Sequence, residues 1–352
     1  MKNDPKIHNI NKLTYLITVS SRILLIHRRL VLVGLVFLLS FISTYSQWLT
    51  GYQYRKTVTI PAAQISGGPH TDFPVLVTIT DADLRTMGNL GLVQNANGWD
   101  IVFSIDHSTV LNQQVESYNP VTGQITAWVR IPTLSGGANF VFYLYFGNAS
   151  VVTDPSTTAT WSSAYKGVWH LSGLQDATIN GNTATNSGTS NTTGIIDYAR
   201  DVPGTGQYFQ ITQITIPNAN FSISVWFRPD VVTDGTLFDL SNSGTLKYFF
   251  SAFNSTSLWW YFESANENDV QITYNTNLNT STWYYLTVIG RYNNNYHEIY
   301  LNGNFVGSSN TILDNKPVLN DIRVGADYGY YPIFAHGDFN GRIDEFRISN
   351  LA

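Results

Sequence analysis

The sequence predicts an all-β protein with two domains, and three observations support this. From Tyr52 onward, short apolar alternations are separated by turn residues about every ten residues, as in sandwiches and barrels. No convincing amphipathic helical stretch interrupts this pattern. Aromatic residues make up 14% of the chain and charged residues only 12%, which favours strands joined by polar loops. A length of 352 residues accommodates two such domains.

Composition excludes several classes of protein. Hydrophobic residues reach 43% and the net charge is only −5, so the chain is not of the disordered type. This mildly acidic balance gives no reason to expect nucleic acid as a partner. The chain has no cysteine, which excludes disulfides, zinc–thiolate sites and thiol nucleophiles.

Residues 1–46 have the pattern of an export signal. A basic segment precedes an apolar run from Leu30 to Ile42, and Thr44-Tyr45-Ser46 then provides a small-x-small site with cleavage expected before Gln47. The run is short for the ~20 residues that cross a bilayer. The alternative is an uncleaved membrane anchor. Only in that case do we expect the protein to contact a membrane, and only through this N-terminal segment. In both cases we expect an exported protein that is secreted, on the cell surface or associated with the outer membrane.

Two sets of strands flank a polar linker. We expect a first β-domain over 47–150, a linker over 151–165 and a second β-domain over 166–352. In the second domain, Phe221–Phe227 alternates cleanly, and Asn302-Gly303 supplies a hairpin turn that needs positive φ. The strands expected in the first domain are Arg55–Ile60, Phe73–Ile79, Trp99–Ile105, Gln124–Ile131 and Asn139–Phe146.

Five short motifs occur in one order in the second half. They are Val168–Leu171, Asp176 with Asn180-Gly-Asn182, Phe221–Phe227, Thr282–Leu286 with Tyr300–Gly303, and Gly341–Ile348. Together they resemble laminin-G-like jelly rolls of the concanavalin-A-like lectin/glucanase superfamily. The resemblance implies two curved antiparallel sheets packed face to face. The chain stops at Ser349–Ala352, where relatives continue, so we expect a piece of a longer surface protein.

The first half resembles an uncharacterised bacterial β-domain family that often precedes such jelly rolls. The matching segments are Gly51–Lys56, Thr71–Val75, Asp100–Phe103, Ala127–Val129 and Tyr143–Asn148. This resemblance implies a β-sandwich-like architecture and export, and it implies no activity.

A structural Ca²⁺ is the first expected ligand. In the resembled family the regions of Asp176 and Asp344 come together, and calcium is common there. The apolar alternation fails at Asp344-Glu345, which predicts a bulge that re-aims a carboxylate. Asp176, Asn180, Asn182 and Asp344 offer the oxygen ligands that calcium prefers. The alternative is that Asp176 caps a turn and Asp344 pairs with an arginine.

Sugar binding is the second expectation. Sugars need flat aromatic platforms together with amide and carboxylate hydrogen-bonding groups. We predict ligand-binding residues in the polar, aromatic-rich segments on expected loops, although aromatic side chains in sandwiches also fill cores. The residues nominated are Trp260, Tyr292, Tyr296, Tyr328, Tyr330 and Tyr331.

The sequence predicts no catalytic residues. Glucanases of the resembled superfamily carry three alternating acids on one strand. Here Glu267-Asn-Asp269 echoes the first two, and Gln271 and Ile272 stand where the third is needed. The histidines show no metal-ligand spacing, and His170 is expected to be structural.

We therefore expect a non-enzymatic, exported surface module that binds carbohydrate or mediates adhesion, its partner an extracellular glycan or a surface protein. The alternatives are a structural spacer or protein-interaction domain of a larger surface protein, and, more weakly, a polysaccharide glycoside hydrolase. Exposed aromatics gathered on one face would favour glycan binding, whereas scattered, buried ones would favour the spacer.

Overall fold

The computed structural model describes residues 48–216, 220–242, 245–262, 270–291, 296–310, 319–328 and 337–351. The chain divides into two compact units. The first comprises residues 1–50 with 106–109, and the expected export segment within it lies outside the described residues. The second unit, Gly51–Ile105 with Val110–Ala352, contains all the strands that the structure describes. Within the described ranges, no helix is long and apolar enough to cross a membrane.

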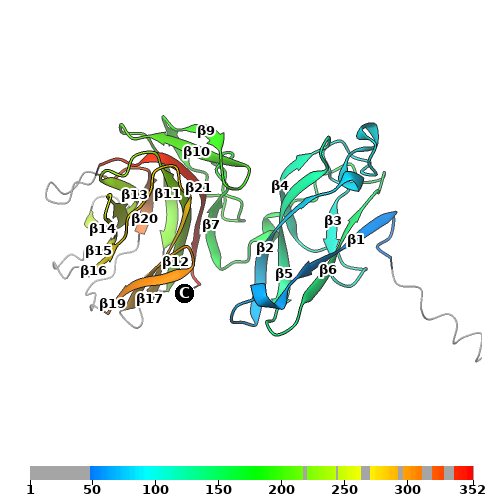
Figure 1. Cartoon of the computed structure of the whole chain (residues 1–352), viewed down its shortest axis with the longest axis horizontal. Helices are drawn as coiled ribbons and strands as arrows, with labels where there is room; N and C mark the ends of the chain where they lie inside the picture. Colours follow the sequence, from blue (N-terminus) through cyan, green and yellow to red (C-terminus); the bar gives the residue numbers. More distant parts are fainter. Residues whose placement is uncertain are drawn as a thin grey trace, which may run out of the picture. The chain divides into compact units, whose positions relative to one another are not determined.

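The N-terminal part of the second unit is a sandwich of two three-stranded antiparallel sheets (Figure 1). One sheet has the order β1-β6-β3 and the other β2-β5-β4. Apolar side chains from both sheets, among them Phe103, Phe142 and Val129, pack into one core. The strands are β1 (Tyr54–Ile60), β2 (His70–Thr80), β3 (Val102–Ser104), β4 (Gln113–Asn119), β5 (Gln124–Leu134) and β6 (Phe140–Phe146). Short 3-10 helices cover Ala62–Gln64, Ala82–Leu84, Met87–Asn89 and, before the next sandwich, Thr158–Thr160.

The C-terminal sandwich is larger and encloses a second core. Its eight-stranded sheet has the order β19-β18-β17-β12-β21-β10-β9 with β7 paired to β21, and its seven-stranded sheet has the order β16-β15-β14-β13-β20-β11-β8. Every pairing between these strands is antiparallel. The strands of the eight-stranded sheet are β7 (Tyr165–Trp169), β9 (Ser190–Thr193), β10 (Tyr198–Pro203), β12 (Phe221–Pro229), β17 (Tyr284–Arg291), β18 (Tyr296–Leu301), β19 (Asn304–Ser309) and β21 (Asn340–Ser349). Those of the seven-stranded sheet are β8 (Thr185–Ser187), β11 (Tyr208–Ile216), β13 (Gly235–Asn242), β14 (Thr245–Phe253), β15 (Ser257–Phe262), β16 (Val270–Asn275) and β20 (Leu319–Val324).

Strict alternation positions β12 in this core. Phe221, Ile223 and Val225 are buried, and the serines between them are half-buried, because successive side chains of a strand point to opposite faces. The expected hairpin is present between β18 and β19. Asn302 and Gly303 have φ of 52° and 78°, the left-handed values that a tight turn of this kind requires.

The expected bulge lies in β21. Ser224 of β12 pairs with Arg347 and Trp226 pairs with Asp344, so one residue of β12 faces two of β21. Glu345, one of those two, has φ of 52°. A bulge of this type turns a side chain away from its regular direction, and here the side chain is the Glu345 carboxylate.

Candidate functional site

A polar, aromatic patch lies on the outer face of the seven-stranded sheet. On β11 and β20, the residues that alternate with the core-facing Phe209, Ile322 and Val324 point to this outer face. The Arg323 guanidinium lies between two tyrosine rings, 4.5 Å from the centroid of Tyr208 and 4.1 Å from that of Tyr328. This stack brings a cation and two aromatic rings together at a half-buried surface.

Amide and carboxylate groups surround the stack. Gln210 Nε2 donates to Asp321 Oδ1 over 2.8 Å, and the Tyr328 backbone amide donates to Asp239 Oδ2 over 2.9 Å. Asp239 comes from β13 and is only 5% exposed. Burial, with a smaller contribution from the charge of Asp327, raises the pKa of Asp239 to about 7. We call Tyr208, Gln210, Asp321, Arg323 and Tyr328 the outer-face patch.

The nominated ligand-binding residues have different positions. Tyr328 belongs to the outer-face patch. Tyr296 is half-buried on β18, with the Arg291 guanidinium 5.8 Å from its ring centroid. The structure contradicts the prediction that Trp260 binds a ligand, because this residue is fully buried and its ring packs near Phe238 in the core. Outside the described residues lie Tyr292, Tyr330, Tyr331 and the acids Glu267 and Asp269.

Asp176, the first nominated calcium ligand, is held by protein donors. Its Oδ1 accepts the backbone amides of Val168 (3.0 Å) and Thr178 (2.9 Å). Its Oδ2 accepts the Thr178 hydroxyl (2.9 Å) and the Asn182 amide (3.0 Å). The carboxylate therefore organises the loop that follows β7, as the turn-capping alternative expects, and calcium binding stays a prediction.

The other nominated calcium ligands lie around this loop and on β21. The side-chain amides of Asn180 and Asn182 both donate to the Lys166 carbonyl, over 3.2 and 3.1 Å. Asp344 Oδ2 accepts the amides of Ile195 (2.9 Å) and Ile196 (3.0 Å). Burial, and then the charge of Glu345, raise the pKa of Asp344 to about 8. Asp176 and Asp344 thus hold separate backbone segments.

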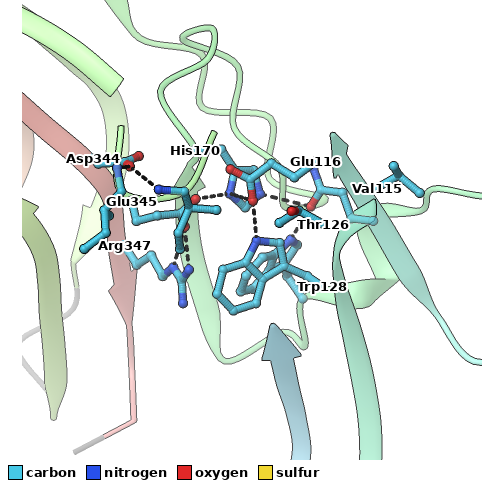
Figure 2. A network of polar contacts seen from close by, with 12 residues as sticks. Val115, Glu116, Thr126, Trp128, His170, Asp344, Glu345 and Arg347 are labelled. Carbon is cyan, nitrogen blue, oxygen red and sulfur yellow. Dashed lines mark hydrogen bonds and ion pairs between the residues drawn. The ribbon is translucent and has the colours of Figure 1, made fainter. Parts of the chain in front are cut away.

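The bulge in β21 directs Glu345 into a buried polar network (Figure 2). Arg347 donates through Nε to Glu345 Oε2 over 3.1 Å, and its guanidinium carbon lies 4.1 Å from the centroid of the Trp128 ring. Burial alone would raise the pKa of Glu345, but the charges of His170 and Arg347 outweigh burial and lower it. The charge of Glu345 is therefore stabilised by its neighbours.

Glu116 of β4 is the second carboxylate of this network (Figure 2). Its Oε2 accepts the Trp128 indole N–H over 2.7 Å and lies 3.6 Å from His170 Nδ1. Burial and the charge of Glu345 raise the pKa of Glu116. Sequence reasoning missed Glu116 because β4 has no apolar alternation to mark it as a strand.

Comparison with known families identifies the C-terminal fold. Residues 203–352 match the family model described as the concanavalin A-like lectin/glucanases superfamily. The C-terminal sandwich is a concanavalin A-like domain. Residues 97–186 match a domain of unknown function (DUF2341), as the resemblance of the first half predicted. The comparison with curated proteins gave no match.

Part of the chain is similar to several solved binding domains. The binding domain of Paraclostridial Mosquitocidal Protein 1 is 14% identical with a TM-score of 0.44, over 54% of this chain and 49% of that chain. The receptor binding domain of botulinum neurotoxin D is 16% identical with a TM-score of 0.42, over 54% and 50%. Domain 4 of the extracellular arabinanase AbnA from Geobacillus stearothermophilus, solved with arabinotriose, is 17% identical with a TM-score of 0.42, over 53% and 91%. The chain therefore spans about half the length of the first two proteins.

Proposed function

We propose that this protein is an exported, non-enzymatic binding module whose concanavalin A-like domain recognises carbohydrate through the outer-face patch. The observation that carries the proposal is the Tyr208–Arg323–Tyr328 stack, with Gln210 and Asp321 hydrogen-bonded beside it. Sugars present apolar C–H faces and rings of hydroxyl groups. A site for them therefore combines aromatic rings with a few planar hydrogen-bonding groups at fixed positions.

The patch is suited to this task because its polar groups are already held in place. Arg323 donates to the Asp327 carbonyl over 3.2 Å while it lies between the two rings, so little side-chain entropy remains to be lost when a ligand binds. The five residues of the patch are half-buried. Their side chains are therefore ordered by neighbours and still reach the surface.

Export is part of the same proposal. It is supported by the basic and apolar pattern of residues 1–46. N-terminal sequencing of the protein from its native envelope tests it, with Gln47 expected as the first residue. An intact N-terminus in a membrane fraction would identify the segment as an anchor, and an intact N-terminus in the cytoplasm would contradict export.

A glycan array tests carbohydrate binding directly, run once with calcium and once with a chelator. We expect binding that Tyr328→Ala abolishes and that Tyr198→Ala, an exposed tyrosine on the opposite sheet, leaves unchanged. Dependence on calcium would connect the site to the loop of Asp176. A folded protein that binds no glycan in either condition would refute the proposal and favour the structural spacer.

A further inference from the structure

The buried network of Figure 2 fixes the protonation of one histidine nitrogen. The Trp161 indole N–H donates to Gln114 Oε1 over 2.7 Å. An indole is a donor only, so this Gln114 atom is the carbonyl oxygen and accepts. His170 Nε2 lies 3.2 Å from the same oxygen, and it must therefore carry a proton and donate.

The other histidine nitrogen faces carboxylate oxygens. His170 Nδ1 lies 2.7 Å from Glu345 Oε1 and 3.6 Å from Glu116 Oε2. In the neutral ring with a proton on Nε2, Nδ1 carries a lone pair. A lone pair aimed at two carboxylates is repulsive unless a cation lies among them, and that cation is either a proton or a metal ion.

His170 and Glu345 each keep one atom for such a cation while a neighbour holds the other atom. Gln114 holds His170 Nε2 and Arg347 holds Glu345 Oε2. Glu116 Oε2, which faces His170 Nδ1, is oriented by the Trp128 indole N–H. Glu116 Oε1 is also buried. Outer partners of this kind orient the ligands of protein metal sites.

We propose that Glu116, His170 and Glu345 bind a divalent transition-metal ion such as Zn²⁺. Their ligand atoms lie within 4.8 Å of one another, and one imidazole with two carboxylates is a donor set that Zn²⁺ accepts. The side chains are 8%, 2% and 1% exposed for His170, Glu116 and Glu345, so few water molecules compete for the ion.

The proposed ligands adjoin a cavity and come from both sandwiches. His170 lines this cavity of about 320 Å³ together with Gln114 and Gln175. Because Glu116 belongs to β4 and Glu345 to β21, a bound ion would join the two sandwiches.

Zinc titration of the full, chelator-treated chain by calorimetry tests the proposal. We expect one equivalent to bind with a Kd of about 1 µM or lower, and excess Ca²⁺ should not displace it. Glu116→Gln, which preserves the side-chain size, should weaken binding by about 10-fold or more. The matched control is Glu298→Gln, a buried glutamate that pairs with Arg291 elsewhere, and it should bind zinc like the wild type.

Three results would overturn the assignment. They are no stoichiometric zinc binding by the folded wild-type chain, unchanged affinity in folded Glu116→Gln, and displacement of zinc by calcium. If Glu116→Gln does not fold, X-ray absorption spectroscopy of the wild-type chain loaded with Co²⁺ tests the site instead. A first shell containing one imidazole nitrogen supports the site, and a shell without one refutes it. The carbohydrate test is independent, because the outer-face patch shares no residue with this network.

Discussion

Replacing Asp176 by alanine removes the carboxylate that closes the loop after β7. Three backbone amides, those of Val168, Thr178 and Asn182, then lose their acceptor. Val168 and Thr178 are buried, whereas Asn182 is half-buried and water can replace its partner. The cost of the substitution therefore comes mainly from the two buried amides.

A buried donor left without an acceptor costs about 1–3 kcal/mol, so Asp176→Ala should lower the free energy of unfolding by about 2–6 kcal/mol. This is a large part of the ~5–15 kcal/mol that stabilises a typical domain. Asp176→Asn should cost less, because the remaining carbonyl oxygen can take the place of Oδ1 and accept both buried amides. A suitable control is Asp230→Ala, which breaks an exposed ion pair with Arg228 worth at most ~1 kcal/mol.

Urea unfolding followed by tryptophan fluorescence measures these differences. The order of stability should be wild type, then Asp230→Ala, then Asp176→Asn, then Asp176→Ala. If Asp176→Ala unfolds at the same urea concentration as Asp230→Ala, the hydrogen-bond argument fails. The series is repeated with calcium and with a chelator. If the chelator destabilises the wild type as much as the alanine substitution does, Asp176 acts through the predicted calcium ion instead.

Two further predictions concern the core and pH. Trp260→Ala should lower the free energy of unfolding by about 3–5 kcal/mol because the indole is fully buried; a loss under about 1 kcal/mol would contradict that burial. The pKa of Asp239 is about 7 in the folded state and 3.8 in the unfolded chain. The stabilising contribution of Asp239 is therefore fully present below pH 3.8 and is lost as the pH rises through about 7. The urea midpoint should therefore fall between pH 4 and 7, and less so in Asp239→Asn; equal slopes in the two proteins would refute this.

Local sequence pattern was sufficient for much of the fold. The alternation of Phe221–Phe227, the Asn302-Gly303 turn and the broken alternation at Asp344-Glu345 each depend on residues that are neighbours in the chain. The structure has β12, a hairpin and a bulge at these places. The strand expected over Trp99–Ile105 is shorter, Val102–Ser104, because the Asp100 carboxylate accepts backbone amides and holds a turn before it.

Tertiary structure decided which polar residues meet. Trp260 and Tyr328 look equally suited to a ligand in the sequence, but strand direction buries the first and leaves the second half-buried on the outer face. Glu116 comes from a strand without apolar alternation and meets Glu345 only when the two sandwiches are folded. Local pattern determines which face of a strand is apolar. The contacts between carboxylates, histidine and arginine depend on the packing of segments far apart in the chain, and no local pattern contains that information.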